Sequence, residues 1–217
     1  MSGILLQARE LEIVRGGRRV LTVGSLTLHA GERVLLEGPI GAGKSSLLLT
    51  LAGLLPRAAG CIEWFGAERH DERSFAPIRG RLGLLFQDPD DPLIGPTVLE
   101  DVEFGPLNLG HSPASAHERA EESLDALGVR HLADRPIHDL SAGEKKLVAL
   151  AGWLAMDSEV LLLDEPSAGW DEATLERVLG VLRSRGISWL AATHEAPTLA
   201  AQATRRLHLR EGRLSAV

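Results

Sequence analysis

Tyrosine is absent from this chain of 217 residues, and cysteine occurs once, at Cys61. A single cysteine excludes an internal disulfide and suits a reducing compartment, and its apolar neighbours predict that it is buried. No run approaches the roughly 20 consecutive apolar residues of a membrane-spanning helix. The N-terminus also lacks the basic start and apolar stretch of a signal peptide. We therefore expect a cytoplasmic protein that meets any membrane only from outside the bilayer.

Positive net charge is lacking as well. The chain has 23 Lys and Arg against 30 Asp and Glu, which gives a formal net charge of -7. Because general nucleic-acid binding depends on neutralising phosphates with basic side chains, we predict no nucleic-acid partner. The local exception, Arg15, Arg18 and Arg19 around a glycine pair, is typical of a solvated loop. Length and composition indicate one globular domain with room for a lobe.

Short apolar runs rich in Val, Ile and Leu recur along the chain. Where helical stretches separate them, they predict buried parallel strands of an α/β core, and the short turns between the early runs predict an added antiparallel layer. We assign residues 1–87 and 141–217 to this core. Residues 88–140 open with prolines and then become helical, so we assign them to a mostly helical inserted lobe. The apolar runs span residues 4–14, 26–29, 33–37, 61–65, 82–86, 160–163, 189–193 and 207–209.

A glycine-rich segment lies between the run 33–37 and a helical stretch. It reads Gly38, Pro39, Ile40, Gly41, Ala42, Gly43, Lys44 and Ser45, which fits G-x-x-x-x-G-K-[ST] in the strand, loop and helix context that this motif needs. Glycines let backbone N–H groups wrap a pyrophosphate, and the helix adds a positive dipole end. Lys44 suits the β- and γ-phosphates of a nucleotide, and the Ser45 hydroxyl suits Mg²⁺. We predict that residues 38–46 bind ATP with Mg²⁺. A dinucleotide-binding fingerprint is the alternative, but that fingerprint needs glycine or alanine at the position that Ser46 occupies.

Two acids end the apolar run 160–163. A buried parallel strand delivers its C-terminal side chains to the edge where open α/β sheets bind ligands. Asp164 is suited to hold hydrated Mg²⁺, and Glu165 to orient and polarise an attacking water. Alone, such acids would more often mark a solvated strand end, but beside a phosphate loop they predict a hydrolytic site.

The segment Leu140-Ser141-Ala142-Gly143-Glu144-Lys145-Lys146 resembles the signature motif of ABC ATPases, usually L-S-G-G-Q/E. Physically, Ser141 and Glu144 form an S-x-x-E capping box that opens a helix. In that family the start of this helix clamps the γ-phosphate bound to the opposite subunit. The resemblance therefore implies a dimer closed by ATP, with Ser141, Gly143 and Glu144 at the nucleotide. Ala142 stands where glycine is usual, and its added methyl group bears on the affinity for nucleotide rather than on the resemblance to the family.

Three further positions resemble the same family, in the same order along the chain. Gln87 is similar to the Q-loop glutamine, Asp171 ends the D-loop-like stretch Ser167-Ala168-Gly169-Trp170-Asp171, and His194 is similar to the switch histidine that contacts the γ-phosphate. The resemblance implies a P-loop NTPase with a RecA-like core, an antiparallel β layer and an inserted helical subdomain. It implies catalytic roles for Lys44, Gln87, Glu165 and His194. It also implies that Ser45, Gln87 and Asp164 hold Mg²⁺, and that the opposite chain supplies Ser141, Gly143 and Asp171.

One feature of that family is missing. Its members usually stack an aromatic residue on adenine just after the first strand, but this chain reads Ile13-Val14-Arg15 there. Either Val14 makes an apolar contact with the base or the Arg15 guanidinium stacks on it. Both alternatives predict weak discrimination between bases.

Residues 87–108 narrow the resemblance. The segment Gln87-Asp88-Pro89-Asp90-Asp91-Pro92, followed by Pro96-Thr97-Val98 and Asp101-Val102-Glu103-Phe104-Gly105-Pro106, is similar to the pattern of energy-coupling-factor importers for cobalt, nickel, biotin and other vitamins. This implies that an integral membrane subunit docks near residues 87–106, against an acidic face of Asp88, Asp90, Asp91 and Asp101. It also implies a place on the inner face of the cell membrane and a second ATPase subunit, either a copy or a paralogue.

Two other functions stay open at this stage. A soluble ABC ATPase could act as a mechanical relay or with the translation machinery, although translation factors usually carry two ATPase domains in one chain. A small-molecule kinase would need a second substrate pocket and has no use for residues 141–144. The sequence therefore favours an ATP-hydrolysing importer subunit.

Overall fold

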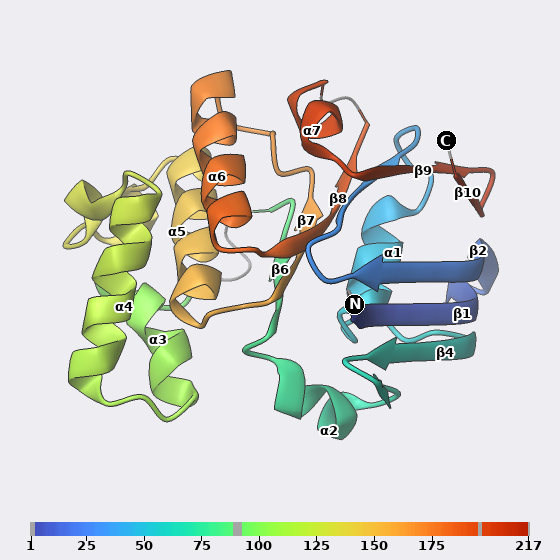
Figure 1. Cartoon of the computed structure of the whole chain (residues 1–217), viewed down its shortest axis with the longest axis horizontal. Helices are drawn as coiled ribbons and strands as arrows, with labels where there is room; N and C mark the ends of the chain where they lie inside the picture. The colour runs from blue at the N-terminus through green and yellow to red at the C-terminus, as the bar shows by residue number, and fades with distance from the viewer. Residues whose placement is uncertain (1–2, 89–92, 195–196, 217) are drawn as a thin grey trace.

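The computed structural model describes residues 3–88, 93–194 and 197–216, and within them ten strands form one sheet. Its spatial order is β5-β4-β1-β2-β10-β9-β3-β8-β7-β6. Strands β9, β3, β8, β7 and β6 run parallel, whereas β5, β4, β1 and β2 pair antiparallel (Figure 1). The strands are β1 (Ile4–Arg15), β2 (Arg18–His29), β3 (Arg33–Glu37), β4 (Ala59–Trp64), β5 (Ala67–Glu68), β6 (Leu82–Leu85), β7 (Val160–Asp164), β8 (Ser188–Thr193), β9 (Arg205–Arg210) and β10 (Arg213–Ala216). The predicted parallel core with an antiparallel layer is confirmed.

Alternate residues of β3 enter two hydrophobic cores on opposite faces of the sheet. Val34 and Leu36 join the core that contains residues of α1, β1 and β2, and Leu35 joins the core that contains residues of α5 and α6. Because both faces are covered, the strand is apolar throughout instead of alternating, as expected for a central parallel strand. This arrangement fixes the carboxyl end of β3, at Glu37, where the glycine-rich loop begins.

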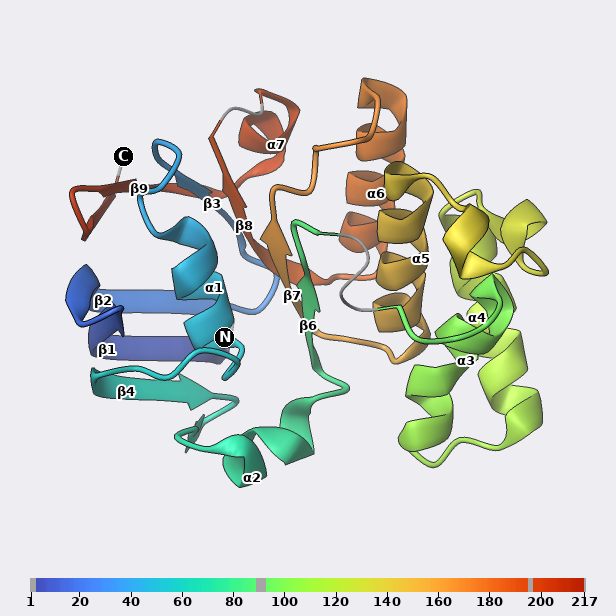
Figure 2. The ribbon, with the colours of Figure 1, turned by 180° about the vertical axis from the view of Figure 1, so that it is seen from behind.

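The helices gather on the two faces and at one end of the sheet. Figure 2 shows α3 and α4 packed beside α5, away from the antiparallel strands. The helices are α1 (Lys44–Leu51), α2 (Glu72–Phe75), α3 (Val98–Asn108), α4 (Pro113–Ala126), α5 (Ala142–Ala155), α6 (Glu172–Ser184) and α7 (Pro197–Gln202), with short 3-10 helices at Ala76–Ile78, Arg130–Leu132 and Ile137–Asp139. Among the helices of the described residues, none has both the length and the apolar character needed to cross a bilayer.

Polar side chains fix where several helices begin. Thr97 accepts the backbone N–H of Glu100 at the start of α3, and Ser112 accepts that of Ser115 at the start of α4. Each side-chain oxygen satisfies one of the backbone donors that a helix start leaves unpaired. Both helices fall in the stretch that we assigned to the inserted lobe.

Four residues that we placed in the docking face of that lobe lie outside the described residues: Pro89, Asp90, Asp91 and Pro92.

Cys61 is half-buried, so the expectation that it is a buried residue is wrong. It lies on β4, where Ile62 and Trp64 point into the core and Cys61 and Glu63 take the other face. Successive side chains of a strand point to opposite sides, so apolar neighbours in sequence do not share the environment of Cys61.

Candidate active site

The predicted site residues come from the carboxyl ends of four neighbouring parallel strands. Gly38 follows β3, His194 follows β8, Glu165 follows β7, and Gln87 lies just beyond β6. This edge is where open α/β sheets bind ligands. A cavity of about 420 Å³ opens there; besides residues 40–46 it is lined by Arg15, Val20, Gln87, Glu165, Ala168 and His194.

The glycine-rich loop is held against the sheet by its own lysine. Lys44, the first residue of α1, is buried and donates from Nζ to the carbonyl oxygens of Gly38 at 2.7 Å and Pro39 at 3.2 Å. A Cβ on Gly38 would lie 2.3 Å from the carbonyl oxygen of Leu209, so only glycine fits between the loop and β9. Within the described residues no side chain caps the start of α1, which leaves its first N–H groups for an anion such as a phosphate.

Asp164 is a buried carboxyl at the carboxyl end of β7, next to Glu165. It is 7% exposed, its side chain hydrogen-bonds with that of Ser45, and its Oδ1 has no hydrogen-bond partner among the described residues. Burial raises the pKa of the Asp164 carboxyl, and the nearby Glu165 carboxylate raises it further, whereas Ser45 and the two lysines Lys44 and Lys146 act in the opposite direction. A cation next to Asp164 would offset the cost of burying its charge.

The donor set fits Mg²⁺. The described residues hold no cluster of three or more His, Cys, Asp or Glu side chains able to bind a metal by themselves. Mg²⁺ in nucleotide sites usually keeps several waters and takes one or two protein oxygens beside phosphate oxygens. The hydroxyl of Ser45 and the unpartnered oxygen of Asp164 are hard ligands of that kind, so the site suits a metal that arrives with a phosphate.

Glu165 has an unusual backbone and an anchored carboxylate. Its φ of 45 lies in the left-handed region, and its N–H donates to the carbonyl of Ala192 at 2.9 Å. Its carboxylate accepts from Thr193 Oγ1 at 3.0 Å and lies 3.1 Å from His194 Nδ1. Left-handed backbone is uncommon for residues other than glycine and costs on the order of 1–3 kcal/mol. The surrounding contacts therefore hold the carboxylate of Glu165 beside the cavity at some expense in backbone strain.

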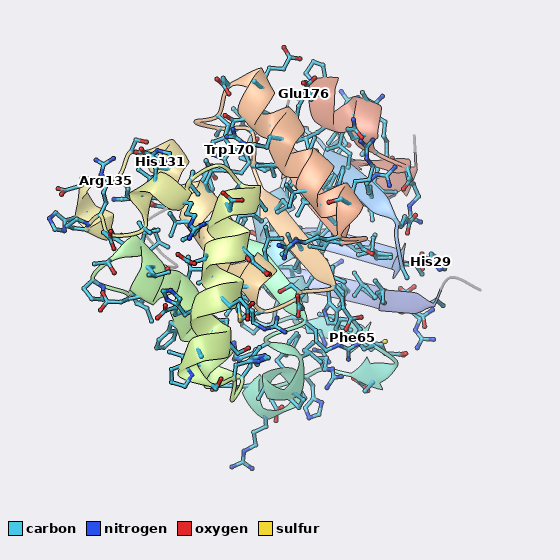
Figure 3. The ribbon with its side chains drawn as sticks, turned by 60° about the vertical axis from the view of Figure 1, so that its left-hand side comes forward. His29, Phe65, His131, Arg135, Trp170 and Glu176 are labelled. Atoms are coloured by element: carbon cyan, nitrogen blue, oxygen red, sulfur yellow. The ribbon has the colours of Figure 1, made fainter. Side chains whose placement is uncertain are left out.

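The motif at residues 140–146 begins α5. Ser141 accepts the N–H of Glu144 at 3.3 Å, and Glu144 accepts the N–H of Ser141 at 2.7 Å, so the predicted capping box is confirmed. These bonds to Ser141 lower the pKa of the Glu144 carboxyl. A Cβ on Gly143 would lie 2.4 Å from the carbonyl oxygen of Gly169, and Trp170 Nε1 donates to the carbonyl of Gly143 at 2.9 Å. The start of α5 is thus joined to the loop before α6, in which Figure 3 labels Trp170.

Several predicted nucleotide contacts lie outside the cavity. The predicted contacts that do not line it are Val14, Gly38, Pro39, Ser141, Gly143, Glu144 and Asp171, together with the predicted metal ligand Asp164. Arg15 does line it, so of the two candidates for the base only Arg15 faces this space. The Asp171 carboxylate accepts the N–H of Thr174 at 2.8 Å and caps α6, a role that the sequence motif did not indicate.

A second cavity, of about 310 Å³, lies in the predicted docking region. Its apolar wall includes Ile94, Phe104, Trp153 and Met156, and Phe104 is 48% exposed. Asp101, which we placed on an acidic docking face, is half-buried and its Oδ1 accepts the N–H groups of Ile94 and Gly95, each at 2.7 Å. The expectation of an outward acidic face is therefore wrong at Asp101, because its carboxylate folds the loop instead; Asp90 and Asp91 lie outside the described residues.

The fold and the site define an α/β ATPase of the P-loop type. The sequence profile of the family described as ABC transporter matches residues 21–168. The cobalt import ATP-binding protein CbiO of Rhodobacter capsulatus is 47% identical over 205 residues, which are 93% of this chain and 73% of that protein. The chain belongs to the ABC transporter ATP-binding family and is the ATP-hydrolysing subunit of a transporter.

Two solved structures are similar to the whole chain. The cbiO1 protein of Clostridium perfringens, part of the ABC transporter complex cbiONQ, matches with a TM-score of 0.85 and 31% identity, covering 98% of this chain and 87% of that one. The dimeric ATP-binding cassette MJ0796 bound to ADP and Pi matches with a TM-score of 0.86 and 25% identity, covering 98% of each chain. These matches confirm the predicted fold class.

Sequence reasoning missed four residues at or near the site. Val20 and Ala168 line the cavity, Trp170 bonds to Gly143, and Lys146 bonds to the main-chain carbonyls of Glu165 and Ala168. Val20 lies on β2, far from the motifs in sequence, and only the sheet brings it near. Trp170 lies in the D-loop-like stretch, and its indole N–H was the available signal, since a buried indole usually finds an acceptor.

Proposed function

We propose that this chain powers an importer of the energy-coupling-factor class that takes up a transition-metal ion such as cobalt or nickel, or a vitamin such as biotin. The observation that carries the proposal is the groove formed by Ile94, Phe104, Trp153 and Met156, because Ile94 and Phe104 fall in the segment that resembles that class. The likeness to a cobalt import protein favours a metal ion as cargo. The chain would then sit on the inner face of the cell membrane, bound to an integral membrane subunit.

The chain acts, in this proposal, as a dimer with a second copy or a paralogue. Ser141, Gly143 and Asp171 do not line the cavity that holds Lys44 and Glu165, which favours their supply by a second chain. The capped start of α5 offers N–H groups and a positive dipole end, which suit a γ-phosphate carried by the other subunit. The dimeric state of MJ0796 supports this arrangement.

Several residues at this edge of the sheet have roles in hydrolysis. Lys44 and the N–H groups at residues 41–46 bind the β- and γ-phosphates, and Ser45, Gln87 and Asp164 would hold Mg²⁺, which neutralises phosphate charge when it is bound. Glu165 orients a water toward the γ-phosphate and withdraws its proton. His194, beside Glu165, contacts the γ-phosphate and keeps the carboxylate aimed. Chemistry is in-line attack of water on the γ-phosphate, which releases ADP and phosphate.

Membrane recovery tests the importer function. We expect the tagged chain, purified gently from its own cells, to bring down an integral membrane protein, and a Phe104→Asp variant to lose it, because a charge would be buried in the apolar groove. Leu54→Asp is the matched control, since Leu54 is similarly exposed at 50% but lies outside the groove. The measurement is mass spectrometry of the recovered proteins, together with ATPase activity of each purified variant.

The outcomes separate the importer from its rival. Basal ATPase activity should survive in Phe104→Asp, because Phe104 is remote from the nucleotide cavity. Recovery of ribosomes without a membrane protein would instead support a soluble relay. Equal membrane recovery by the Phe104 and Leu54 variants would remove the groove from the docking surface.

Arg15 predicts weak selection between purine bases. It and Val20 line the cavity, and neither offers the paired donors and acceptors that distinguish adenine from guanine. We expect GTP to compete with ATP with an inhibition constant within about tenfold of the Kd for ATP. Arg15→Ala should weaken both nucleotides to a similar extent, because guanidinium stacking does not depend on base identity. Strict preference for ATP in a competition titration would exclude this mode of base binding.

A further inference from the structure

Lys146 is a buried cation for which the reaction scheme has no role. It lies in the second turn of α5, is 2% exposed, and is followed by the buried apolar residues Leu147 and Val148. Its Nζ donates to the carbonyl oxygens of Glu165 and Ala168, each at 3.1 Å. The side chain therefore spans from the helix that Ser141 caps to the turn that follows β7.

That turn sets the direction of the Glu165 side chain. The Glu165 carbonyl also accepts the N–H of Ala168 at 3.2 Å, and the Glu165 N–H is bonded to β8 through Ala192 at 2.9 Å. Lys146 thus completes the hydrogen bonding on the carbonyl side of a residue whose φ of 45 is otherwise unfavourable. Without it, the carbonyls of Glu165 and Ala168 would each lose a charge-assisted bond.

Packing alone does not account for an ammonium group at this position. Burial lowers the pKa of Lys146, while the carboxylates of Asp164, Glu165 and Asp88 act in the opposite direction. Removing one partner of a buried charge-assisted contact leaves the other partner unsatisfied, which is destabilising. A methionine or leucine would fill the space but leave the carbonyls of Glu165 and Ala168 without this donor, so the ammonium group serves the turn at residues 165–168 and not only packing.

We propose that Lys146 is a positioning residue for hydrolysis, which fixes the turn at residues 165–168 so that the Glu165 carboxylate stays aimed into the nucleotide cavity. The proposal rests on the proposed role of Glu165. Lys146 does not face the cavity and contacts no reacting atom, so it acts through the main chain of Glu165. The expected signature is a slower chemical step with unchanged nucleotide binding.

The test compares Lys146→Met with Lys146→Arg in the full chain. Methionine keeps the volume and removes every donor, whereas arginine keeps a cation with several donors. We expect kcat for ATP to fall at least about tenfold in Lys146→Met, with KM within about twofold, when activity is measured well below the lowered Tm of this variant. Lys146→Arg should restore kcat to within about threefold of the unchanged chain, because its donors can reach the same carbonyls.

Ser158→Ala is the matched control for the loss of a buried side-chain bond to a carbonyl. Ser158 is buried and its Oγ donates to the carbonyl of Gly80 at 2.9 Å, remote from the nucleotide cavity. This variant should lose thermal stability, as Lys146→Met does, but it should keep kcat. The pair therefore separates an effect on the turn at Glu165 from a general loss of packing.

Three results would overturn the proposal: full kcat in Lys146→Met, a parallel loss of kcat and nucleotide affinity, or equal damage from Met and Arg. Should Lys146→Met fail to fold, Lys146→Gln, whose shorter side chain cannot reach both carbonyls, is judged by the same criteria. Glu165→Gln, measured alongside, separates the two ideas. If it hydrolyses ATP at full rate, the role of Glu165 is wrong; if it is inactive while Lys146→Met is fully active, only the positioning role is wrong.

Discussion

Glu165→Gln is expected to hydrolyse ATP about 10²- to 10⁴-fold more slowly than the unchanged chain, because an amide cannot take the proton of the attacking water. The neutral side chain keeps the shape of the carboxylate and one acceptor oxygen for Thr193 Oγ1, now 3.0 Å from Glu165 Oε2. Nucleotide binding should therefore survive. The measurement is phosphate release at saturating Mg-ATP, with Kd for ATP determined separately.

The same variant should accumulate as an ATP-bound dimer. If hydrolysis opens the dimer, blocking it leaves ATP between the two chains, and size-exclusion chromatography should show a dimer with ATP and a monomer without it. Glu159→Gln is the control: Glu159 is an exposed carboxylate paired with Arg81 at the other end of β7. A Glu165→Gln protein with wild-type turnover would refute the assignment of the water-orienting residue.

Lys44→Met is expected to weaken binding of ATP and ADP by about 2–3 kcal/mol, roughly 30- to 150-fold in Kd, which is the worth of one lost charge-assisted hydrogen bond. In the structure the Lys44 ammonium already lies at the loop, bonded to the carbonyls of Gly38 and Pro39. Its charge is therefore placed before a phosphate arrives, so little ordering is needed on binding. Isothermal titration calorimetry in the presence of Mg²⁺ measures the change.

A control and a stability measurement make the result specific. Arg73→Met removes an exposed cation on α2 and should leave Kd unchanged. Circular dichroism should show that Lys44→Met remains folded. Unaltered nucleotide affinity in a folded Lys44→Met protein would mean that the phosphates bind elsewhere.

Motifs with a fixed local geometry could be predicted from the sequence. The order strand, glycine loop, helix around Lys44 and the capping box of Ser141 and Glu144 depend on neighbours a few residues away, so local chemistry specifies them. The parallel core was predictable because uninterrupted apolar runs such as residues 160–163 are typical of strands covered on both faces. The profile and the solved structures then confirmed the fold.

Contacts made across the fold were not predictable. Lys146 and the carbonyl of Ala168 are far apart in sequence and meet only because α5 packs beside the turn after β7. Charge on a helix usually indicates a solvated face, so nothing in the residue order distinguished Lys146 from Lys145. Asp101 was misjudged for a related reason: its carboxylate turns back to the N–H groups of Ile94 and Gly95, and such loop closures leave no periodic trace.

Helix α5 forms a wall of the apolar groove that we propose as the docking surface, and it also carries Lys146. The groove is lined by Ala149, Gly152 and Trp153 of this helix and by Met156 at its C-terminal cap. Lys146 and the groove therefore share one continuous helix, which rises about 1.5 Å per residue. A helix of this kind transmits displacement nearly as a stiff rod, because every backbone hydrogen bond along it would have to stretch for it to yield. If a membrane partner docks there, force that it applies at Trp153 would reach the main chain of Glu165 through Lys146.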